Sequence, residues 1–237
     1  MLQRLRNLKQ RLKFYLEHDL GLKKPSDGFS ISKGSFKRYL PLNPIIVDCG
    51  SYNGSDAIDL VKIYPEATVY CFEPVPELFI QLKDNTDAYP NIHCYQIALS
   101  DRDGTADMYV SSQGSDGSSS LLEPSTHLDD HPNVLFDNTI RVKVMKLDTW
   151  AQVNNVRSVD LLWLDMQGFE FQMLEASPNI LHHTKLIHTE ISMRDTYKGV
   201  LVYDRFRAWL EANSFCVIKE AIPNGSDMGN VLLLRKT

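Results

Sequence analysis

Residues 45–54, with the sequence IIVDCGSYNG, constrain the fold more than any other part of the chain. The branched apolar residues predict a short buried strand, which ends in an acid and is followed by a turn with two glycines. Apolar residues at helical spacing resume at residues 56–61. The pattern predicts the strand–turn–helix unit that opens an α/β domain, in which ligands bind beyond the carboxyl ends of the strands. We expect Gly50 and Gly54 to let the backbone approach a bound molecule, because they carry no Cβ.

The chain then continues to alternate between short apolar runs and helical patterns. Strands are predicted at residues 45–49, 68–72, 92–97, 141–145, 159–165, 185–191, 215–220 and 231–234, with helices near 54–64, 76–85, 169–175 and 200–212 and a short helix from residue 148. Strands that alternate with helices in this way indicate βαβ units and a parallel sheet. The last two strands are expected to pair antiparallel through a turn at residues 223–225.

One region departs from this rhythm. The turn at residues 100–104 predicts a hairpin-like detour between residues 97–99 and 106–110. Residues 111–139, rich in Ser, Gly, Asp and Pro, show no clear period. So long a segment inside a domain often serves as a lid or binding loop, and a mobile insertion without a role is the alternative. We expect residues 118–120 and their surroundings to close over a bound ligand.

The N-terminal segment has a different character from the rest of the chain. Leucines recur every three or four residues across residues 2–20, with Arg and Lys between them, which predicts a basic amphipathic helix. Such a helix packs on its own domain, pairs with a second copy as a homodimer, or lies on a membrane surface, and the first two are favoured. The predicted organisation is therefore a basic helix and linker at residues 1–40 and one domain at residues 41–237.

Composition excludes several classes of protein. No apolar run is long enough to span a membrane, and the N-terminus lacks the features of a secretory signal. Residues 1–40 are basic although the whole chain carries a net charge of −5, so the domain is acidic and a large nucleic-acid surface is not expected. The four cysteines are scattered without metal-ligand spacing, which predicts reduced core thiols in a cytoplasmic protein.

Two acids beside the first two strands narrow the choice of ligand. The dinucleotide fingerprint has a middle glycine that the turn at residues 50–54 lacks, and Asp48 would place negative charge near a pyrophosphate. An acid at Asp48 suits a cationic amino group instead. Glu73, at the end of the second strand, suits the two hydroxyls of a ribose. The order of amino-group acid, glycine turn and ribose acid predicts S-adenosylmethionine, with S-adenosylhomocysteine as product and with the adenine near residues 97–101.

These motifs together resemble the FkbM-type methyltransferases. The resemblance is carried over residues 45–192 by IVDCGSYNG (46–54), YCFEP (70–74), ALS (98–100) with Gly104, LDT (147–149) and LDMQGFE (164–170) with Leu174 and Glu175. The Asp-x-Gln-Gly-x-Glu element is the most specific of them. The resemblance implies a class I, Rossmann-like, doubly wound fold whose mostly parallel seven-stranded sheet ends in an antiparallel C-terminal strand. It does not cover residues 1–40.

The motif positions assign the site residues. Cofactor binding is predicted for Asp48, Gly50, Ser51, Tyr52, Asn53, Gly54, Glu73, Pro74, Ala98, Leu99, Ser100 and Asp165. Asp165 and Glu190 are predicted as catalytic residues that end neighbouring strands and face one cleft, with Asp165 beside the sulfonium. They would position the acceptor or, as the alternative, chelate a divalent ion. His188 is the candidate general base because its ordinary pKa lies near neutrality, and a hydrogen-bonded core histidine is the alternative. No metal is predicted, since the sequence shows no compact ligand cluster.

The sequence therefore predicts an S-adenosylmethionine-dependent O-methyltransferase. The expected acceptor is a hydroxyl or carboxyl group of a small molecule, such as a sugar or a polyketide or peptide natural product. Two alternatives stay open, namely a noncatalytic module that binds an adenosyl cofactor and an NAD-dependent oxidoreductase.

Overall fold

The computed structural model describes residues 28–112, 116–126 and 133–236 of the chain. The basic helix predicted at residues 2–20 lies outside this part, as do residues 113–115 and 127–132 of the predicted loop. Within the described residues, no helix is long and apolar enough to cross a membrane.

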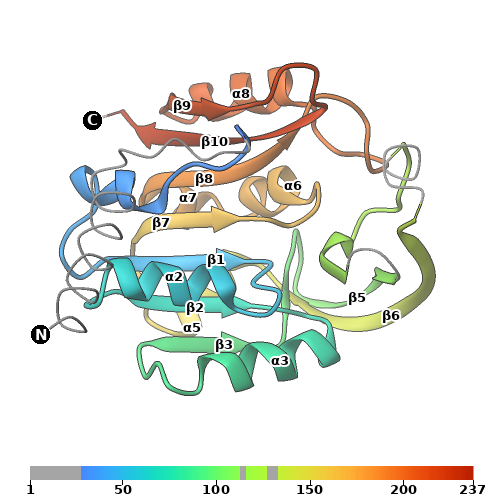
Figure 1. Cartoon of the computed structure of the whole chain (residues 1–237), viewed down its shortest axis with the longest axis horizontal. Helices are drawn as coiled ribbons and strands as arrows, with labels where there is room; N and C mark the ends of the chain where they lie inside the picture. The colour runs from blue at the N-terminus through green and yellow to red at the C-terminus, as the bar shows by residue number, and fades with distance from the viewer. Residues whose placement is uncertain (1–27, 113–115, 127–132, 237) are drawn as a thin grey trace, which may run out of the picture.

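A seven-stranded sheet forms the centre of the molecule, in the order β3-β2-β1-β7-β8-β10-β9 (Figure 1). Its strands are β1 (Ile45–Cys49), β2 (Thr68–Phe72), β3 (Ile92–Tyr95), β7 (Val159–Leu164), β8 (Thr184–Ser192), β9 (Phe215–Ala221) and β10 (Met228–Arg235). The five strands from β3 to β8 are parallel, and β10 runs antiparallel to both β8 and β9. This is the predicted α/β arrangement, including the antiparallel C-terminal pair.

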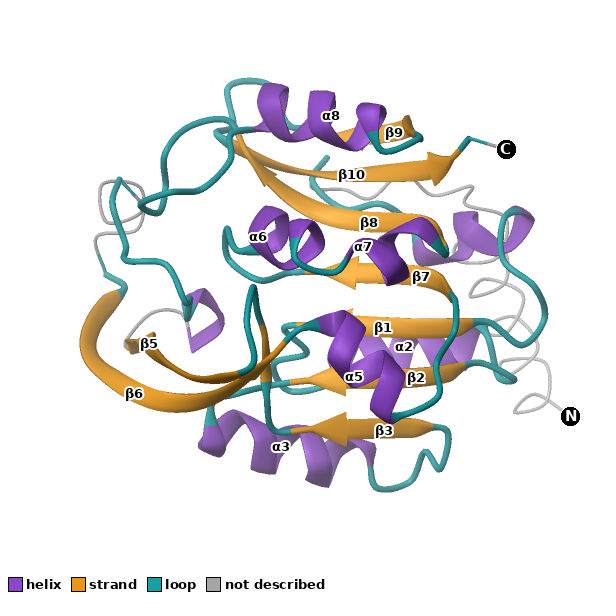
Figure 2. Cartoon of the chain, turned by 180° about the vertical axis from the view of Figure 1, so that it is seen from behind, coloured by secondary structure: helices purple, strands orange, loops and turns teal. Residues whose placement is uncertain are grey.

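Helices cover both faces of this sheet, so the fold is doubly wound (Figure 2). One face carries the 3-10 helix η2 (Lys33–Arg38), α2 (Ser55–Ile63) and α3 (Pro76–Thr86), which contribute Phe36, Leu60 and Leu82 to one core cluster. The other face carries α5 (Leu147–Val153), α6 (Glu170–Glu175), α7 (Pro178–His182) and α8 (Tyr203–Ala212). Among these, α7 is a short helix opened by a proline, and the sequence pattern does not predict it.

Part of the predicted N-terminal linker belongs to the packed domain. Ile31, Phe36 and Leu40 are buried in the same core cluster as α2 and α3. Lys33 in η2 forms ion pairs with Asp56 at 2.5 Å and with Asp59 at 3.1 Å, both in α2. Residues 31–40 therefore pack against α2, the helix that follows the glycine turn, and stabilise it.

A second sheet of three strands projects from the carboxyl ends of the main sheet (Figure 1). It contains β4 (Ala98–Leu99), β5 (Gly104–Ser112) and β6 (Leu135–Met145) in the order β4-β6-β5. The hairpin predicted around residues 100–104 is wrong, because β6 lies between the two strands and its Val144 pairs with both Ala98 and Gly104. Both β4 and β5 therefore pair with β6, which is distant in the sequence, and not with each other.

The segment at residues 111–139 has more structure than its composition predicts. β5 extends to Ser112, β6 begins at Leu135, and η3 (Asp116–Ser118) lies between them. The apolar face of this small sheet packs on the start of α3, where Met108 and Val142 meet Val75 and Leu78. The alternation in β6 is easily missed because charged side chains on its outer face interrupt a short apolar series.

Candidate active site

A cavity opens where the carboxyl ends of the parallel strands meet the second sheet. It encloses about 900 Å³ of empty space, its open mouth included. Its walls come from the turn after β1, the end of β2, β4, the turn after β7 and residues 117–121. The lining residues are Cys49, Gly50, Ser51, Tyr52, Ser55, Asp56, Phe72, Glu73, Pro74, Leu78, Ile97, Ala98, Leu99, Met108, Gly117, Ser119, Leu121, Asp165, Met166, Gln167 and Phe169.

The two glycines of the first turn are required by the packing of the protein itself. Gly50 has φ +83°, and a Cβ added to it would lie 1.9 Å from the carbonyl oxygen of Asp165. Gly54 has φ +84°, and its added Cβ would lie 2.8 Å from Leu82 and 2.9 Å from Thr86 of α3. Gly50 lines the cavity and Gly54 does not. The ligand approach expected of Gly54 is therefore replaced by contact with α3.

Glu73 joins the glycine turn to the end of β2. Its Oε2 accepts a hydrogen bond from the backbone N–H of Tyr52 at 3.0 Å, and its Oε1 accepts one from that of Val75 at 2.9 Å. Burial raises the pKa of Glu73 to about 7 against the effect of these two donors. Each oxygen keeps a second lone pair. The carboxylate is thus fixed in place and can still accept hydrogen bonds from a ligand.

Asp48 lies below the turn and outside the cavity wall. Its side chain is buried, its Oδ2 accepts a long contact of 3.8 Å from the thiol of Cys71, and its Oδ1 has no hydrogen-bond partner among the described residues. Burial raises its pKa to about 8, with the charge of Asp56 adding to the effect. Asp56, which the sequence analysis did not select, lines the cavity in its place.

The structure brings eight of the twelve predicted cofactor residues onto the cavity wall: Gly50, Ser51, Tyr52, Glu73, Pro74, Ala98, Leu99 and Asp165. Besides Asp48 and Gly54, two others lie off it. Asn53 accepts a hydrogen bond from the backbone N–H of Ser55. Ser100 is buried, and its hydroxyl donates to Asp101. Apolar lining residues such as Leu78, Met108 and Phe169 were missed, because only the folded chain brings their elements together.

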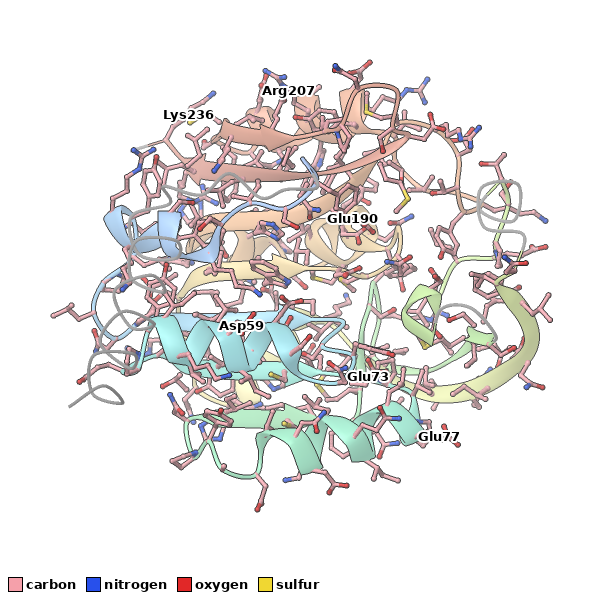
Figure 3. The ribbon with its side chains drawn as sticks, viewed as in Figure 1. Asp59, Glu73, Glu77, Glu190, Arg207 and Lys236 are labelled. Carbon is pink, nitrogen blue, oxygen red and sulfur yellow. The ribbon has the colours of Figure 1, made fainter. Side chains whose placement is uncertain are left out.

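Asp165 and Glu190 meet at the ends of the neighbouring strands β7 and β8. The side-chain amide nitrogen of Gln167 donates to Asp165 Oδ1 at 2.8 Å and to Glu190 Oε2 at 3.2 Å. Burial raises the pKa of Asp165 to about 6, and burial together with Asp165 raises that of Glu190 well above its usual range. Figure 3 shows Glu190 and Glu73 on the side of the main sheet that faces the second sheet. The two acids thus share one donor, but only Asp165 lines the cavity, whereas Glu190 does not reach its wall.

His188 lies away from the cavity wall. Its ring stacks on Trp163 with centroids 3.7 Å apart and planes 13° from parallel, and Phe36 of η2 lies 6.0 Å away. Burial lowers its pKa to about 3, and the nearby Lys33 contributes in the same direction. This neutral, stacked ring matches the alternative of a core histidine, although its Nδ1 has no hydrogen-bond partner among the described residues.

Glu170 is the acid that follows the turn after β7, and its carboxylate stabilises the backbone of that turn. Its Oε1 accepts from the backbone N–H of Met166 at 2.8 Å and, more weakly, from that of Gly168 at 3.4 Å. Gly168 has φ +95° and Gln167 has φ +52°, so the turn is tight and left-handed. Within the described residues, no group of three or more His, Cys, Asp or Glu side chains is arranged to hold a metal ion.

Comparison with known proteins assigns the family. Residues 48–217 match the Methyltransferase FkbM domain. The chain belongs to the FkbM methyltransferase family. It is 31% identical over 232 residues to the 2-O-methyltransferase NoeI of Sinorhizobium fredii, which covers 96% of this chain and 93% of the relative. The predicted family is confirmed. The predicted enzyme class, an S-adenosylmethionine-dependent methyltransferase, is confirmed as well.

Two solved structures share the fold. A methyltransferase FkbM from Methylobacillus flagellatus aligns with a TM-score of 0.56 at 11% identity, covering 94% of this chain and 50% of that one. The fibrillarin/Nop5p complex contains a chain that aligns with a TM-score of 0.51 at 16% identity, covering 83% of this chain and 75% of that one. At such identities the likeness supports the class I methyltransferase fold and nothing finer.

Proposed function

We propose that this enzyme transfers a methyl group from S-adenosylmethionine to a hydroxyl oxygen of a small polar molecule such as a sugar. One observation carries the proposal: a single cavity has Glu73 on one wall and Asp165 on another. The first acid suits a ribose, and the second suits the proton of an acceptor hydroxyl. The relative whose name specifies 2-O-methylation is similar to this chain over nearly its whole length.

The residues around the turn suit the adenosyl cofactor. Glu73 retains acceptor lone pairs on both oxygens, as a ribose diol requires. Ile97, Leu78 and Met108 supply an apolar wall for a flat ring. Asp56 lines the cavity beside Gly50, where it suits a cationic amino group. When bound, S-adenosylmethionine supplies an electrophilic methyl on its sulfonium.

The acceptor side is assigned to Asp165. A pKa near 6 leaves its carboxyl ionised at neutral pH yet basic enough to take a proton, which is the balance a general base needs. Asp165 would orient the acceptor hydroxyl and receive its proton, while the shared donor Gln167 holds Asp165 and Glu190 in place. His188 is not given this role, since Trp163 and Phe36 surround it.

The remaining predictions concern partners and location. We keep the homodimer through the N-terminal helix, the absence of nucleic-acid and membrane partners, and a cytoplasmic location as proposals. The four cysteines are all free thiols, which suits a reducing compartment.

A turnover assay with methyl-labelled S-adenosylmethionine tests the proposal. Sugars and other polyols should become labelled, and methylation at a single hydroxyl should be resolved by mass spectrometry. A matched panel of carboxylic acids should stay unlabelled. Labelled acids with unlabelled polyols would overturn the hydroxyl assignment, and cofactor binding without turnover on either panel would favour the noncatalytic module.

A further inference from the structure

Gln167 connects more parts of the site than any single acid does. It lies in the turn after β7 with φ +52°, a left-handed conformation that residues other than glycine seldom adopt. It lines the cavity, and its side-chain nitrogen donates to the two carboxylates of Asp165 and Glu190. An amide group has two N–H donors and one oxygen, so it can serve both carboxylates at once and keep its oxygen for another partner.

The other partner fixes which way the amide points. The hydroxyl of Tyr197 shares its one proton between the backbone carbonyl of Ser118 at 2.8 Å and Gln167 Oε1 at 3.1 Å. With this hydroxyl on its oxygen side and two carboxylates on the other, the amide turns its nitrogen toward the carboxylates. Tyr197 is buried, so solvent does not compete for this contact.

The backbone of Gln167 holds the segment that walls the cavity. Its carbonyl accepts a hydrogen bond from the hydroxyl of Ser120 at 2.8 Å. The same hydroxyl accepts from the backbone N–H of Leu122, and Ser120 itself is fully buried. Ser119 and Leu121, on either side of it, line the cavity. One residue therefore contacts both acids and the segment that contributes Ser119 and Leu121 to the cavity wall.

We propose that Gln167 is a positioning residue that aligns Asp165 and Glu190 for proton removal from the acceptor and couples that alignment to the seating of residues 118–122. The proposal rests on the proposed function, because it deepens the role of the same two acids. Gln167 does not exchange a proton itself. Gln167 fixes the positions of the two carboxylates relative to each other, and Tyr197 stabilises one orientation of its side-chain amide.

The charged groups that act on the pair are carboxyls. Burial and the charge of Asp56 raise the pKa of Asp165, and burial with the charges of Asp165 and Glu170 raises that of Glu190. Asp165 in turn adds to the effect of burial in raising the pKa values of Asp48, Glu73 and Tyr197. No Lys or Arg of the described residues is among the groups that shift these two carboxyls. Two amide hydrogen bonds are then the main contacts that favour the ionised forms.

The test is carbon-13 NMR titration of the side-chain carboxyls in the full-length protein, without acceptor. Asp165→Asn and Glu190→Gln assign the two signals. In Gln167→Met, which keeps the length of the side chain and removes its donors, both midpoints should rise by about one pH unit. Gln172→Met is the matched control, since that amide donates to the carbonyl of Gly199. It should leave both midpoints unchanged.

Unchanged midpoints in a folded Gln167→Met protein would overturn the proposal, whether or not an acceptor is known. Should that variant fail to fold, Tyr197→Phe removes the hydroxyl that orients the amide and should move the midpoints in the same direction by less. With a methylated acceptor in hand, kcat of Gln167→Met should fall about 10- to 100-fold and the acidic limb of its pH profile should move upward, with cofactor affinity retained. If kcat and the limb are unchanged, the role in alignment is refuted while methyl transfer stands.

Discussion

The two halves of the cavity are built in different ways. On the cofactor side, the geometry is fixed mainly by backbone groups within a few residues of β1 and β2. Gly50 and the two N–H groups that donate to Glu73 are examples. On the acceptor side, side chains from segments far apart in the sequence meet around Gln167, including Tyr197 from 30 residues away. The first half is fixed by local turn geometry, whereas the second depends on tertiary contacts. The cofactor side should therefore tolerate substitution least, and the acceptor side should respond in rate rather than in stability.

The largest effect is expected where the two halves touch. Gly50→Ala places a Cβ 1.9 Å from the Asp165 carbonyl oxygen, and backbone cannot move aside as a side chain can. The free energy of unfolding should fall by roughly 3 kcal/mol or more. Binding of S-adenosylhomocysteine should be lost in whatever protein remains folded. Denaturant unfolding and calorimetric titration measure the two effects.

Gly199→Ala is the control for Gly50→Ala. Gly199 has a similar φ of +86° but no atom within 4 Å of an added Cβ. It should cost only the backbone strain, about 1 to 2 kcal/mol. Equal losses in the two variants would show that strain alone, and not the contact between the two turns, fixes Gly50.

A large effect on rate is expected at Asp165. Asp165→Asn keeps the shape of the side chain and removes its basicity, so kcat should fall about 100-fold or more, as is typical for the loss of a general base. The wild-type rate should fall as the pH drops through about 6, because protonation of Asp165 removes the same function. A pH series with a methylated acceptor measures both.

Asp107→Asn is the matched control for Asp165→Asn. Asp107 is exposed on β5, paired with Arg141. Its substitution should leave kcat and the pH profile as in wild type. An unchanged rate in Asp165→Asn would move the proton acceptor to another group.

The smallest effect is expected at His188. His188→Phe keeps a ring on Trp163 and removes both nitrogens, so kcat should stay within about threefold of wild type rather than fall about 100-fold. Steady-state kinetics in parallel with cofactor titration measures this. A hundredfold loss of kcat at unchanged cofactor affinity would restore His188 as the base.

The contrast also explains what the sequence could predict. β1 and β2 were predicted with their observed bounds, and Glu73 was found, because an apolar run followed by an acid and a glycine turn is a local signal. The pairing of β4 and β5 with β6 was not predicted, since Val144 of β6 follows its partners Ala98 and Gly104 by 46 and 40 residues. His188 is selected by the ordinary pKa of its residue type, which does not reveal that η2 covers that face of the sheet.

Titration of S-adenosylhomocysteine into Glu73→Ala and Glu77→Ala tests the central claim most directly. Glu77 lies in the first turn of the neighbouring α3 and is exposed, so it controls for the loss of an acid near the site (Figure 3). The account predicts that Glu73→Ala binds at least about tenfold more weakly than wild type, since it loses the carboxylate partner of the ribose hydroxyls. Glu77→Ala should bind as wild type does. Equal, undiminished affinity in a folded Glu73→Ala protein would contradict the account of this cavity as the cofactor site.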